Sequence, residues 1–195
     1  LALLRELREL RPAEVMVPKA ERADSLARLR AACPGIAVLA LVESARGVLA
    51  AEALAAAEGV QRLVFGSIDF ALDMDLSGDA LGFDHAAARL ALASRAAGIA
   101  APVAGVTVAI DDEALLRAEL ARARAHGFSA KLCIHPRQVA VVHDALRPSA
   151  TELDWARRVV AASQAASGAA VQLDGRMVDK PVLLRAQALL ARAAS

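Results

Sequence analysis

Short apolar runs rich in β-branched residues alternate along this chain with longer segments whose apolar residues recur at helical spacing. Strand–helix alternation of this kind predicts an α/β fold with a parallel sheet and right-handed helical crossovers. The five strand–helix units leave open both part of an eight-stranded barrel and an open doubly wound sheet. The predicted strands are Val15–Pro18, Ile36–Val42, Arg62–Phe65, Pro102–Val108 and Ala130–Ile134.

Segments of helical period lie between these runs, and several of them end at a glycine. The acidic pair Asp111-Asp112 suits a helix start, because carboxylates accept hydrogen bonds from the first free backbone N–H groups of a helix. Leu1–Leu10 forms a charged amphipathic segment ahead of the first strand. The predicted helices are Ala23–Ala32, Ala50–Glu58, His85–Ala97 and Asp112–His126.

The strand signals become sparse after residue 150, which indicates a second part of the chain. We therefore divide the chain into a β/α domain, residues 1–150, and a C-terminal helical extension, residues 151–195. The extension is expected to contain a helix at Thr151–Ala166 with Thr151 as its N-cap, a short strand at Ala170–Leu173, a turn at Asp174-Gly175 and a final helix at Val182–Ala194.

Composition and charge argue against several classes of protein. Aromatic residues make up 3% of the chain and the net charge is +1, with acidic and basic residues interspersed, so we expect neither a nucleic-acid nor a membrane partner. The sequence contains neither a secretory signal nor a nucleotide phosphate loop. Its two cysteines, Cys33 and Cys133, form no CxxC motif; Cys133 is expected to be a buried thiol, and the cytoplasm is the expected location.

Polar residues follow each predicted strand at its carboxyl end, where the functional loops of parallel α/β folds converge. Glu43 and Asp69 are the most informative of them, because they follow consecutive strands that would lie about 4.8 Å apart. Two such carboxylates can share Mg²⁺, although each could instead cap a helix or form an ion pair. The full set is Lys19, Glu21, Glu43, Ser44, Arg46, Asp69, Thr107 and His135.

Two further residues of this set have two interpretations each. Arg46 enters a helix beside Gly47, so it could bind an anion or form a salt bridge. His135 directly precedes Pro136, which favours a loop histidine that holds the backbone over a catalytic one.

Five motifs in this order resemble the citrate lyase β-subunit-like proteins of the HpcH/HpaI aldolase superfamily, and they extend over nearly the whole chain. They are Val17–Glu21, Leu41–Gly47, Phe65–Phe70, Lys131–Pro136 and Asp174–Pro181. The resemblance implies a (β/α)₈ TIM barrel with a C-terminal helical extension. The family barrel begins with three further βα units ahead of the position of Val15, including an arginine that binds the substrate carboxylate. Since the chain starts with Leu1 rather than Met, we expect these units to be absent only from this stretch of a longer protein.

The resemblance also implies a Mg²⁺-dependent carbon–carbon lyase that cleaves or forms a 3-hydroxyacyl-CoA such as citryl-, malyl- or citramalyl-CoA. The products of cleavage are an acyl-CoA and a keto acid. The metal-binding residues of the family fall on Glu43 and Asp69, and its lid aspartate, contributed across a subunit contact, falls on Asp179. We therefore expect Asp179 and Glu43 to be catalytic residues. Substrate contacts are expected from Arg46, Lys19 and His135. The protein is expected to form a homotrimer or homohexamer.

Three alternatives to this lyase remain open at this stage. One is a CoA-independent, metal-dependent aldolase of hydroxy-keto acids, and another is a condensing enzyme that also hydrolyses the thioester. The third is a non-catalytic subunit with a partial barrel. The motif around Asp179 favours the CoA-dependent branch.

Overall fold

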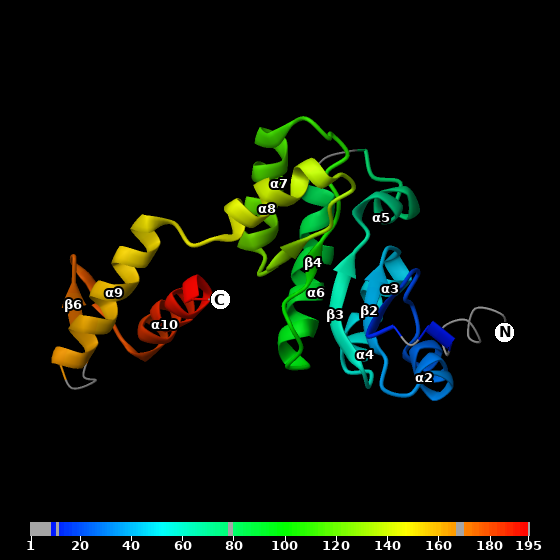
Figure 1. Ribbon diagram of the computed structural model, residues 1–195, viewed down its shortest axis with the longest axis horizontal. Coiled ribbons are helices and arrows are strands. Elements are labelled where there is room, and N and C mark those ends of the chain that lie inside the picture. The colour runs from blue at the N-terminus through cyan, green and yellow to red at the C-terminus, as the bar shows by residue number, and fades with distance from the viewer. Residues whose placement is uncertain (1–8, 11, 78–79, 167–169, 195) are drawn as a thin grey trace. The chain divides into compact units, whose positions relative to one another are not determined.

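A computed structural model of the protein describes residues 9–10, 12–77, 80–166 and 170–194. Five strands form one sheet in the order β1-β2-β3-β4-β5, and all neighbouring strands are parallel. Figure 1 labels β2, β3 and β4 of this sheet. The α/β fold with a parallel sheet is therefore confirmed. The strands are β1 (Glu14–Val17), β2 (Ala37–Val42), β3 (Val60–Phe65), β4 (Val103–Ala104) and β5 (Ala130–Lys131).

The order of the strands follows the order of the chain without a reversal. Consecutive strands of a β/α barrel lie side by side in this way, whereas a doubly wound sheet reverses its order at a switch point. Burial alternates along β2: Val38, Ala40 and Val42 are 0% exposed, and the residues between them are half-buried. One face of β2 is therefore packed, while the other keeps access to solvent in the described part of the chain.

Helices cover the packed face of the sheet. Leu26, Leu54 and Leu90 come from three different helices and join the buried strand residues in one core. Each fully buried leucine contributes about 1.5–3 kcal/mol to stability. The helices are α2 (Ala23–Ala32), α3 (Ala45–Leu49), α4 (Ala51–Ala55), α5 (Ser67–Asp73), the 3₁₀ helix η1 (Ala80–Phe83), α6 (Asp84–Ala96), α7 (Glu113–Ala125) and α8 (Pro136–Leu146).

The predicted helices at Ala23–Ala32, His85–Ala97 and Asp112–His126 are confirmed to within one residue at each end. The helix predicted at Ala50–Glu58 begins within one residue of α4 but is three residues too long, because α4 ends at Ala55. The preceding helix α3 was not predicted; Ser44 caps it by accepting a hydrogen bond from the Gly47 N–H. The short helix α5 and the longer helix α8 were not predicted. The amphipathic segment expected at residues 1–10 lies largely outside the described residues.

The two predicted strands at Pro102–Val108 and Ala130–Ile134 are much shorter in the structure. Each has two residues in the sheet, β4 and β5. Beyond these residues, backbone carbonyls accept hydrogen bonds from side chains: the Gly105 carbonyl accepts from Lys131 Nζ and the Thr107 carbonyl from Gln138 Nε2. Side-chain donors thus replace the sheet ladder at this edge.

The chain divides into two compact units, residues 1–142 and 143–195. The second unit has its own small core of Ala156, Val159, Val178, Ala186 and Leu189. It consists of α9 (Ala150–Ala165), an antiparallel hairpin of β6 (Val171–Leu173) and β7 (Arg176–Val178), and α10 (Lys180–Ala194). The predicted division at residue 150 stays a prediction.

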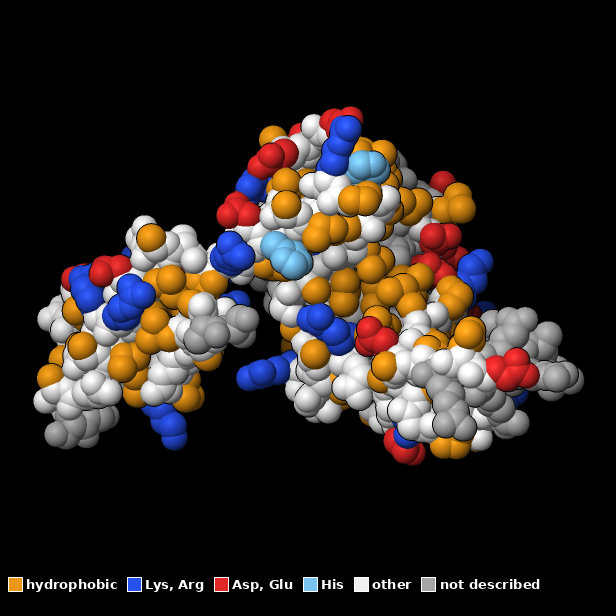
Figure 2. All heavy atoms as spheres, viewed as in Figure 1, with side chains coloured by type: hydrophobic (Ala, Val, Ile, Leu, Met, Phe, Trp, Pro, Cys, Tyr) orange, Lys and Arg blue, Asp and Glu red, His pale blue; other side chains and the backbone are white. Residues whose placement is uncertain are grey.

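Acidic and basic side chains are scattered over the face drawn in Figure 2, in both units. In the described part of the chain, no helix has the length and apolar character needed to cross a membrane. Cys33 is buried, whereas Cys133 is half-buried, so the expectation of a buried Cys133 is wrong.

Candidate active site

Glu43 directly follows β2 and is 8% exposed. Side chains alternate along a strand, so Glu43 shares the half-buried face of β2 with Leu39 and Leu41. Its Oε1 accepts a hydrogen bond from the Lys19 backbone N–H at 2.8 Å. Its Oε2 lies against Gly66, the residue after β3. The carboxylate is therefore held between the ends of three neighbouring strands.

Asp69 is not a strand-end residue as expected, because α5 begins at Ser67 and places Asp69 in its first turn. The side chain is exposed, and it has no hydrogen bond or ion pair with any residue that the structure describes. A carboxylate in the first turn of a helix is favoured by the helix dipole. Asp69 follows Gly66, against which Glu43 packs, so the two acidic residues belong to adjacent segments at the carboxyl edge of β2 and β3.

These two carboxylates fit a hard divalent cation. Among the described residues, no group of three or more His, Cys, Asp or Glu side chains could hold a metal ion. Mg²⁺ does not need such a cage, since it commonly takes one or two carboxylates and completes its octahedron with water and substrate oxygens. The oxygen donors of Glu43 and Asp69 match that requirement.

The loops after β1 and β2 are joined beside Glu43. Ser44 Oγ donates a hydrogen bond to Glu21 Oε1 at 2.6 Å, and the Arg46 Nε lies 4.0 Å from Glu21 Oε2. The Arg46 side chain is 78% exposed, and an exposed pair at this distance is worth little. Arg46 is therefore held loosely, at the entrance to α3, and its guanidinium can reach an anionic ligand.

His135 precedes α8 and is half-buried. Its Nδ1 accepts a hydrogen bond from the Arg137 backbone N–H at 3.2 Å, as expected for a loop histidine that holds the backbone. The neutral ring therefore carries its proton on Nε2. This nitrogen can donate to an oxygen of a ligand.

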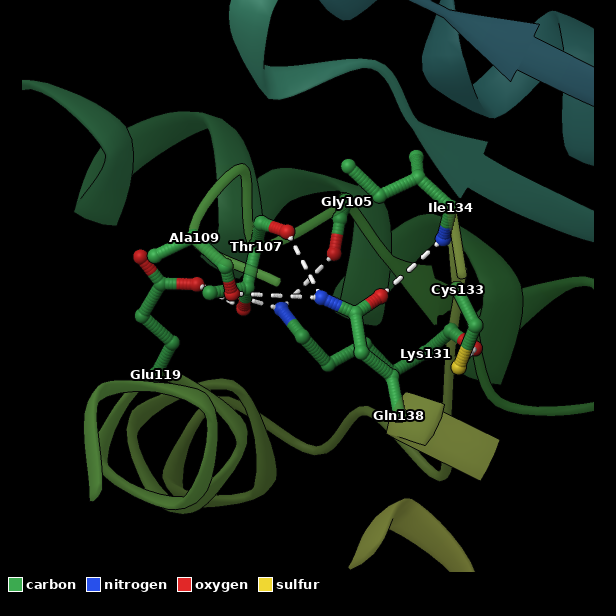
Figure 3. Close-up of polar contacts among 8 residues, drawn as sticks. All are labelled: Gly105, Thr107, Ala109, Glu119, Lys131, Cys133, Ile134 and Gln138. Atoms are coloured by element: carbon green, nitrogen blue, oxygen red, sulfur yellow. Dashed lines mark hydrogen bonds and ion pairs between the residues drawn. The ribbon is translucent and has the colours of Figure 1, made fainter. Parts of the chain in front are cut away.

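A buried polar network lies behind the loops that follow β4 and β5 (Figure 3), and the sequence did not predict it. Lys131, the last residue of β5, has a side chain 3% exposed. Its Nζ donates to the Gly105 carbonyl at 2.8 Å and to Glu119 Oε2 at 3.3 Å. Burial lowers the pKa of Lys131, and the neighbouring Glu119 opposes this effect. Thr107 donates its hydroxyl to the same Glu119 oxygen.

Gln138 completes this network and is 1% exposed. Its Oε1 accepts from the Ile134 backbone N–H at 3.0 Å, and its Nε2 donates to the Thr107 carbonyl at 2.9 Å. One amide thus ties the loop after β4 to the loop that carries His135 (Figure 3). No periodic pattern marks Gln138, although Lys131 lies in one of the sequence motifs.

A cavity of about 460 Å³ lies beside this network, with a wall that is mainly apolar. Its lining includes Phe65, Phe83, Phe128 and Lys131, and it includes neither Glu43 nor Asp69. We place the candidate active site at the two carboxylates, because chemistry on parallel α/β sheets takes place at the loops beyond the strand ends.

Asp179 lies in the second unit, between β7 and α10. The side chain is half-buried, and Oδ1 accepts a hydrogen bond from the Val182 backbone N–H at 3.2 Å. This is the contact of a helix N-cap. A catalytic role for Asp179 stays a prediction.

Two protein-family models match the chain. The HpcH/HpaI aldolase/citrate lyase family matches residues 3–136, and a family of carbon–carbon bond lyases of the TIM-barrel fold matches residues 84–195. Together they extend over both compact units.

Relatives of this chain support the same family assignment. A citrate lyase subunit beta-like protein of Mycobacterium tuberculosis is 39% identical over 186 residues, which cover 92% of this chain and 66% of that protein. A (3S)-malyl-CoA thioesterase of Cereibacter sphaeroides is 34% identical over 185 residues, covering 92% and 64%. The chain therefore spans about two thirds of the length of these relatives.

Solved structures agree with these relatives. The CitE protein of Mycobacterium tuberculosis, crystallised with magnesium, acetoacetate and coenzyme A, superposes with a TM-score of 0.85 at 37% identity, over 98% of this chain and 73% of that one. A citrate lyase beta subunit from the same organism, with oxaloacetate and magnesium, gives 0.64 at 34% identity over 74% and 67%. On these grounds the chain belongs to the HpcH/HpaI aldolase/citrate lyase family.

Proposed function

We propose that this protein is a Mg²⁺-dependent carbon–carbon lyase that cleaves a 3-hydroxyacyl-CoA into an acyl-CoA and a keto acid. The observation that carries the proposal is the buried Glu43 carboxylate at the end of β2, with Asp69, whose side chain has no partner among the described residues, on the neighbouring segment. Relatives of known structure hold magnesium together with keto acids, and one also holds coenzyme A. Citryl-, malyl- and citramalyl-CoA are the candidate substrates.

Glu43 and Asp69 would hold the metal. Bound there, Mg²⁺ would polarise the oxygens of the keto-acid part and orient it. Glu43 suits this role because Lys19 fixes one of its oxygens and packing against Gly66 limits its movement. Asp69 suits it because none of the described residues engages its carboxylate.

Cleavage requires the removal of a proton from the C3 hydroxyl and the addition of a proton at C2. In the cleavage direction the C3 hydroxyl passes its proton to solvent, the C2–C3 bond breaks, and C3 becomes the carbonyl carbon of the keto acid. The electron pair of the broken bond enters the thioester enolate, which then takes a proton at C2. We assign the proton at C2 to Asp179, once closure of the second unit brings it within hydrogen-bond reach.

Substrate binding falls to residues at the carboxyl edge of the sheet. The exposed Arg46 guanidinium is suited to a carboxylate or phosphate of the substrate. His135 Nε2 can donate to a substrate oxygen, because its Nδ1 is occupied by the backbone. We include Lys19 in this group as well.

The proposal also includes the complete barrel, the oligomeric state and the location of the protein. The strand order supports a (β/α)₈ barrel that three N-terminal βα units complete. A site that uses Asp179 across a subunit contact needs a homo-oligomer, for which we propose a trimer or hexamer. We propose the cytoplasm as its location, since the two cysteines of the sequence form no CxxC motif.

Thioester hydrolysis is the second candidate, because the Cereibacter sphaeroides relative is a malyl-CoA thioesterase. The two activities differ in their products. A lyase releases a keto acid and leaves the CoA thiol esterified, whereas a thioesterase releases the hydroxy acid and a free thiol.

The test is an assay of the purified full-length protein with malyl-, citramalyl- and citryl-CoA, in Mg²⁺ and in EDTA. A keto-acid trap and a thiol reagent are read in parallel. We expect Mg²⁺-dependent release of a keto acid from at least one substrate without a matching rise in free thiol. Free thiol without keto acid would favour the thioesterase. Turnover of the corresponding free hydroxy acid, without CoA, would favour the aldolase.

A further inference from the structure

We propose that Lys19 and Gly66 are positioning residues for Glu43: Lys19 acts through its backbone N–H, and Gly66 acts by having no side chain. The assignment of Mg²⁺ to Glu43 rests on the function proposed above. The positioning itself rests on the contacts between Glu43 and its two neighbouring loops. The proposed function includes Lys19 among the substrate-binding residues, whereas this inference concerns its backbone N–H.

Lys19 has an unusual backbone conformation, with φ at +48°. The left-handed region is unfavourable for residues other than glycine, and asparagine and aspartate tolerate it better than lysine does. The other two non-glycine residues in this region, among those described, are both aspartates, Asp75 and Asp174. A lysine keeps such a conformation only where its surroundings hold it there.

The conformation of Lys19 aims its N–H at the carboxylate. This N–H donates to Glu43 Oε1 at 2.8 Å, and the next residue, Ala20, donates its N–H to the Leu41 carbonyl at 2.9 Å. The Lys19 side chain is exposed and has no partner among the described residues. The contact of Lys19 with the candidate site is therefore made by its main chain.

Gly66, the residue after β3, restricts the position of the Glu43 carboxylate. A Cβ at Gly66 would lie 2.5 Å from Glu43 Cβ and 2.9 Å from Oε2, which is closer than van der Waals contact allows. Gly66 has φ at −83°, so space and not backbone conformation makes glycine necessary here. Its N–H donates to the Val42 carbonyl at 2.9 Å, so the glycine is tied to β2 and cannot easily move away.

Lys19 and Gly66 therefore fix the orientation of the Glu43 carboxylate before Mg²⁺ binds. Groups that orient a metal ligand by hydrogen bonding matter almost as much as the ligand, and their loss commonly weakens metal binding by about 10–100-fold. The backbone of Lys19 should therefore affect Mg²⁺ affinity even though its side chain does not touch the carboxylate.

The first arm of the test measures Mg²⁺ affinity by titration calorimetry on the full-length protein. Lys19→Gly keeps the N–H and the left-handed backbone, so its affinity should stay within about twofold of wild type. Lys19→Val strains that backbone and should weaken binding by about tenfold or more. Gly66→Ala should weaken it similarly. Asp174→Val places the same strain in the β6–β7 turn and should leave affinity unchanged.

Either of two results in this arm would overturn the proposal. In one, Lys19→Val binds Mg²⁺ as wild type does. In the other, Lys19→Gly loses as much affinity as Lys19→Val, which would show that the side chain is what matters.

The second arm needs no metal and separates this proposal from the proposed function. Amide hydrogen exchange is followed by NMR in the metal-free protein and in Glu43→Ala. Exchange at Lys19 should become faster by about tenfold or more when its acceptor is removed, while the Ala20 amide, which donates to Leu41, should keep its rate. An unchanged Lys19 rate would refute the positioning contact. Wild-type protein that binds no Mg²⁺ would refute the metal assignment, and the exchange result would still decide this proposal.

Discussion

At the scale of single residues, the two candidate metal ligands have different surroundings. Glu43 is buried and fixed by Lys19 and Gly66, whereas Asp69 is exposed on the first turn of α5. A change at Glu43 therefore disturbs packing as well as chemistry. A change at Asp69 affects a side chain that does not belong to the core.

We expect Asp69→Ala to abolish Mg²⁺ binding and lyase activity. The free energy of unfolding should fall by less than about 1 kcal/mol, because the lost contribution is a surface interaction with the helix dipole. Calorimetry with Mg²⁺, the keto-acid assay and urea denaturation measure the three quantities. Asp75→Asn, which removes a second exposed carboxylate just beyond α5, is the matched control and should behave as wild type. Metal binding retained in Asp69→Ala would remove Asp69 from the site.

At the scale of elements, helix starts decide several boundaries. The sequence placed the N-cap of α9 at Thr151, which is wrong. Ser149 caps this helix: its Oγ accepts from the Glu152 N–H at 3.2 Å, and Glu152 Oε2 accepts from the Ser149 N–H at 2.8 Å. This reciprocal pair is a capping box, and the Ser149–Glu152 spacing was visible in the sequence.

Ser149→Ala should therefore destabilise the second unit by about 0.5–2 kcal/mol, since the Glu152 N–H loses its acceptor, the Ser149 Oγ. Thr151→Ala, at the exposed position first expected to be the cap, should change stability far less. Trp155 is the one tryptophan of the sequence and lies in α9, so its fluorescence in a urea titration reports on this unit. Equal losses in the two variants would contradict the assignment of the cap.

A second contact between elements links the start of α6 to the end of α7. Asp84 Oδ1 accepts from Arg122 Nη2 at 2.8 Å and lies 2.8 Å from His126 Nε2. The hydrogen bond from Arg122, with a smaller effect of His126, lowers the pKa of Asp84 below its ordinary 3.8, against the opposing effect of desolvation. The stabilisation is therefore complete above pH 3.8 and is lost as the pH falls through the lower folded-state pKa.

Because the pKa of Asp84 is lowered, we expect Asp84→Asn to make the unfolding free energy depend less strongly on pH in acid solution. Between about pH 4 and pH 2 the unfolding free energy of wild type should fall more steeply than that of the variant. Urea denaturation at a series of pH values measures both slopes. A slope in Asp84→Asn identical to that of wild type would show that this contact does not stabilise the fold.

At the scale of the whole molecule, Asp179 lies in one compact unit and the two candidate metal ligands, Glu43 and Asp69, lie in the other. Asp179→Asn keeps an acceptor for the Val182 N–H and removes the titratable carboxylate. We expect it to bind Mg²⁺ as wild type does and to lower turnover strongly. Loss of metal binding in this variant would contradict the lid role.

Mixed oligomers then show whether Asp179 acts across a subunit contact. Random mixing of Asp179→Asn with Asp69→Ala protomers should restore about a quarter of the sites, since each hybrid site needs one intact contribution from each partner. No recovery after mixing would place Asp179 in the same protomer as its site.

Local sequence determined most of the helices and the parallel sheet. Helix α2 and the Asp112 cap of α7 follow from periodicity and capping, which act over a few neighbouring residues. The position of Glu43 directly after β2 followed from the same pattern, because the end of an apolar run marks the end of a strand. Asp69, Thr107 and His135 instead lie several residues beyond the ends of their strands. The family resemblance then singled out Glu43 and Asp69 from the polar residues that follow the strands.

Tertiary structure alone decided how these residues are held. The left-handed backbone of Lys19, the closeness of Gly66 to Glu43 and the Gln138 amide between two loops join segments far apart in the chain. No local pattern encodes such contacts, since each depends on the distance between two strands or loops once the core has formed. Beyond the short strand β4, the Gly105 and Thr107 carbonyls accept hydrogen bonds from the side chains of Lys131 and Gln138, which is again a contact between segments distant in the chain.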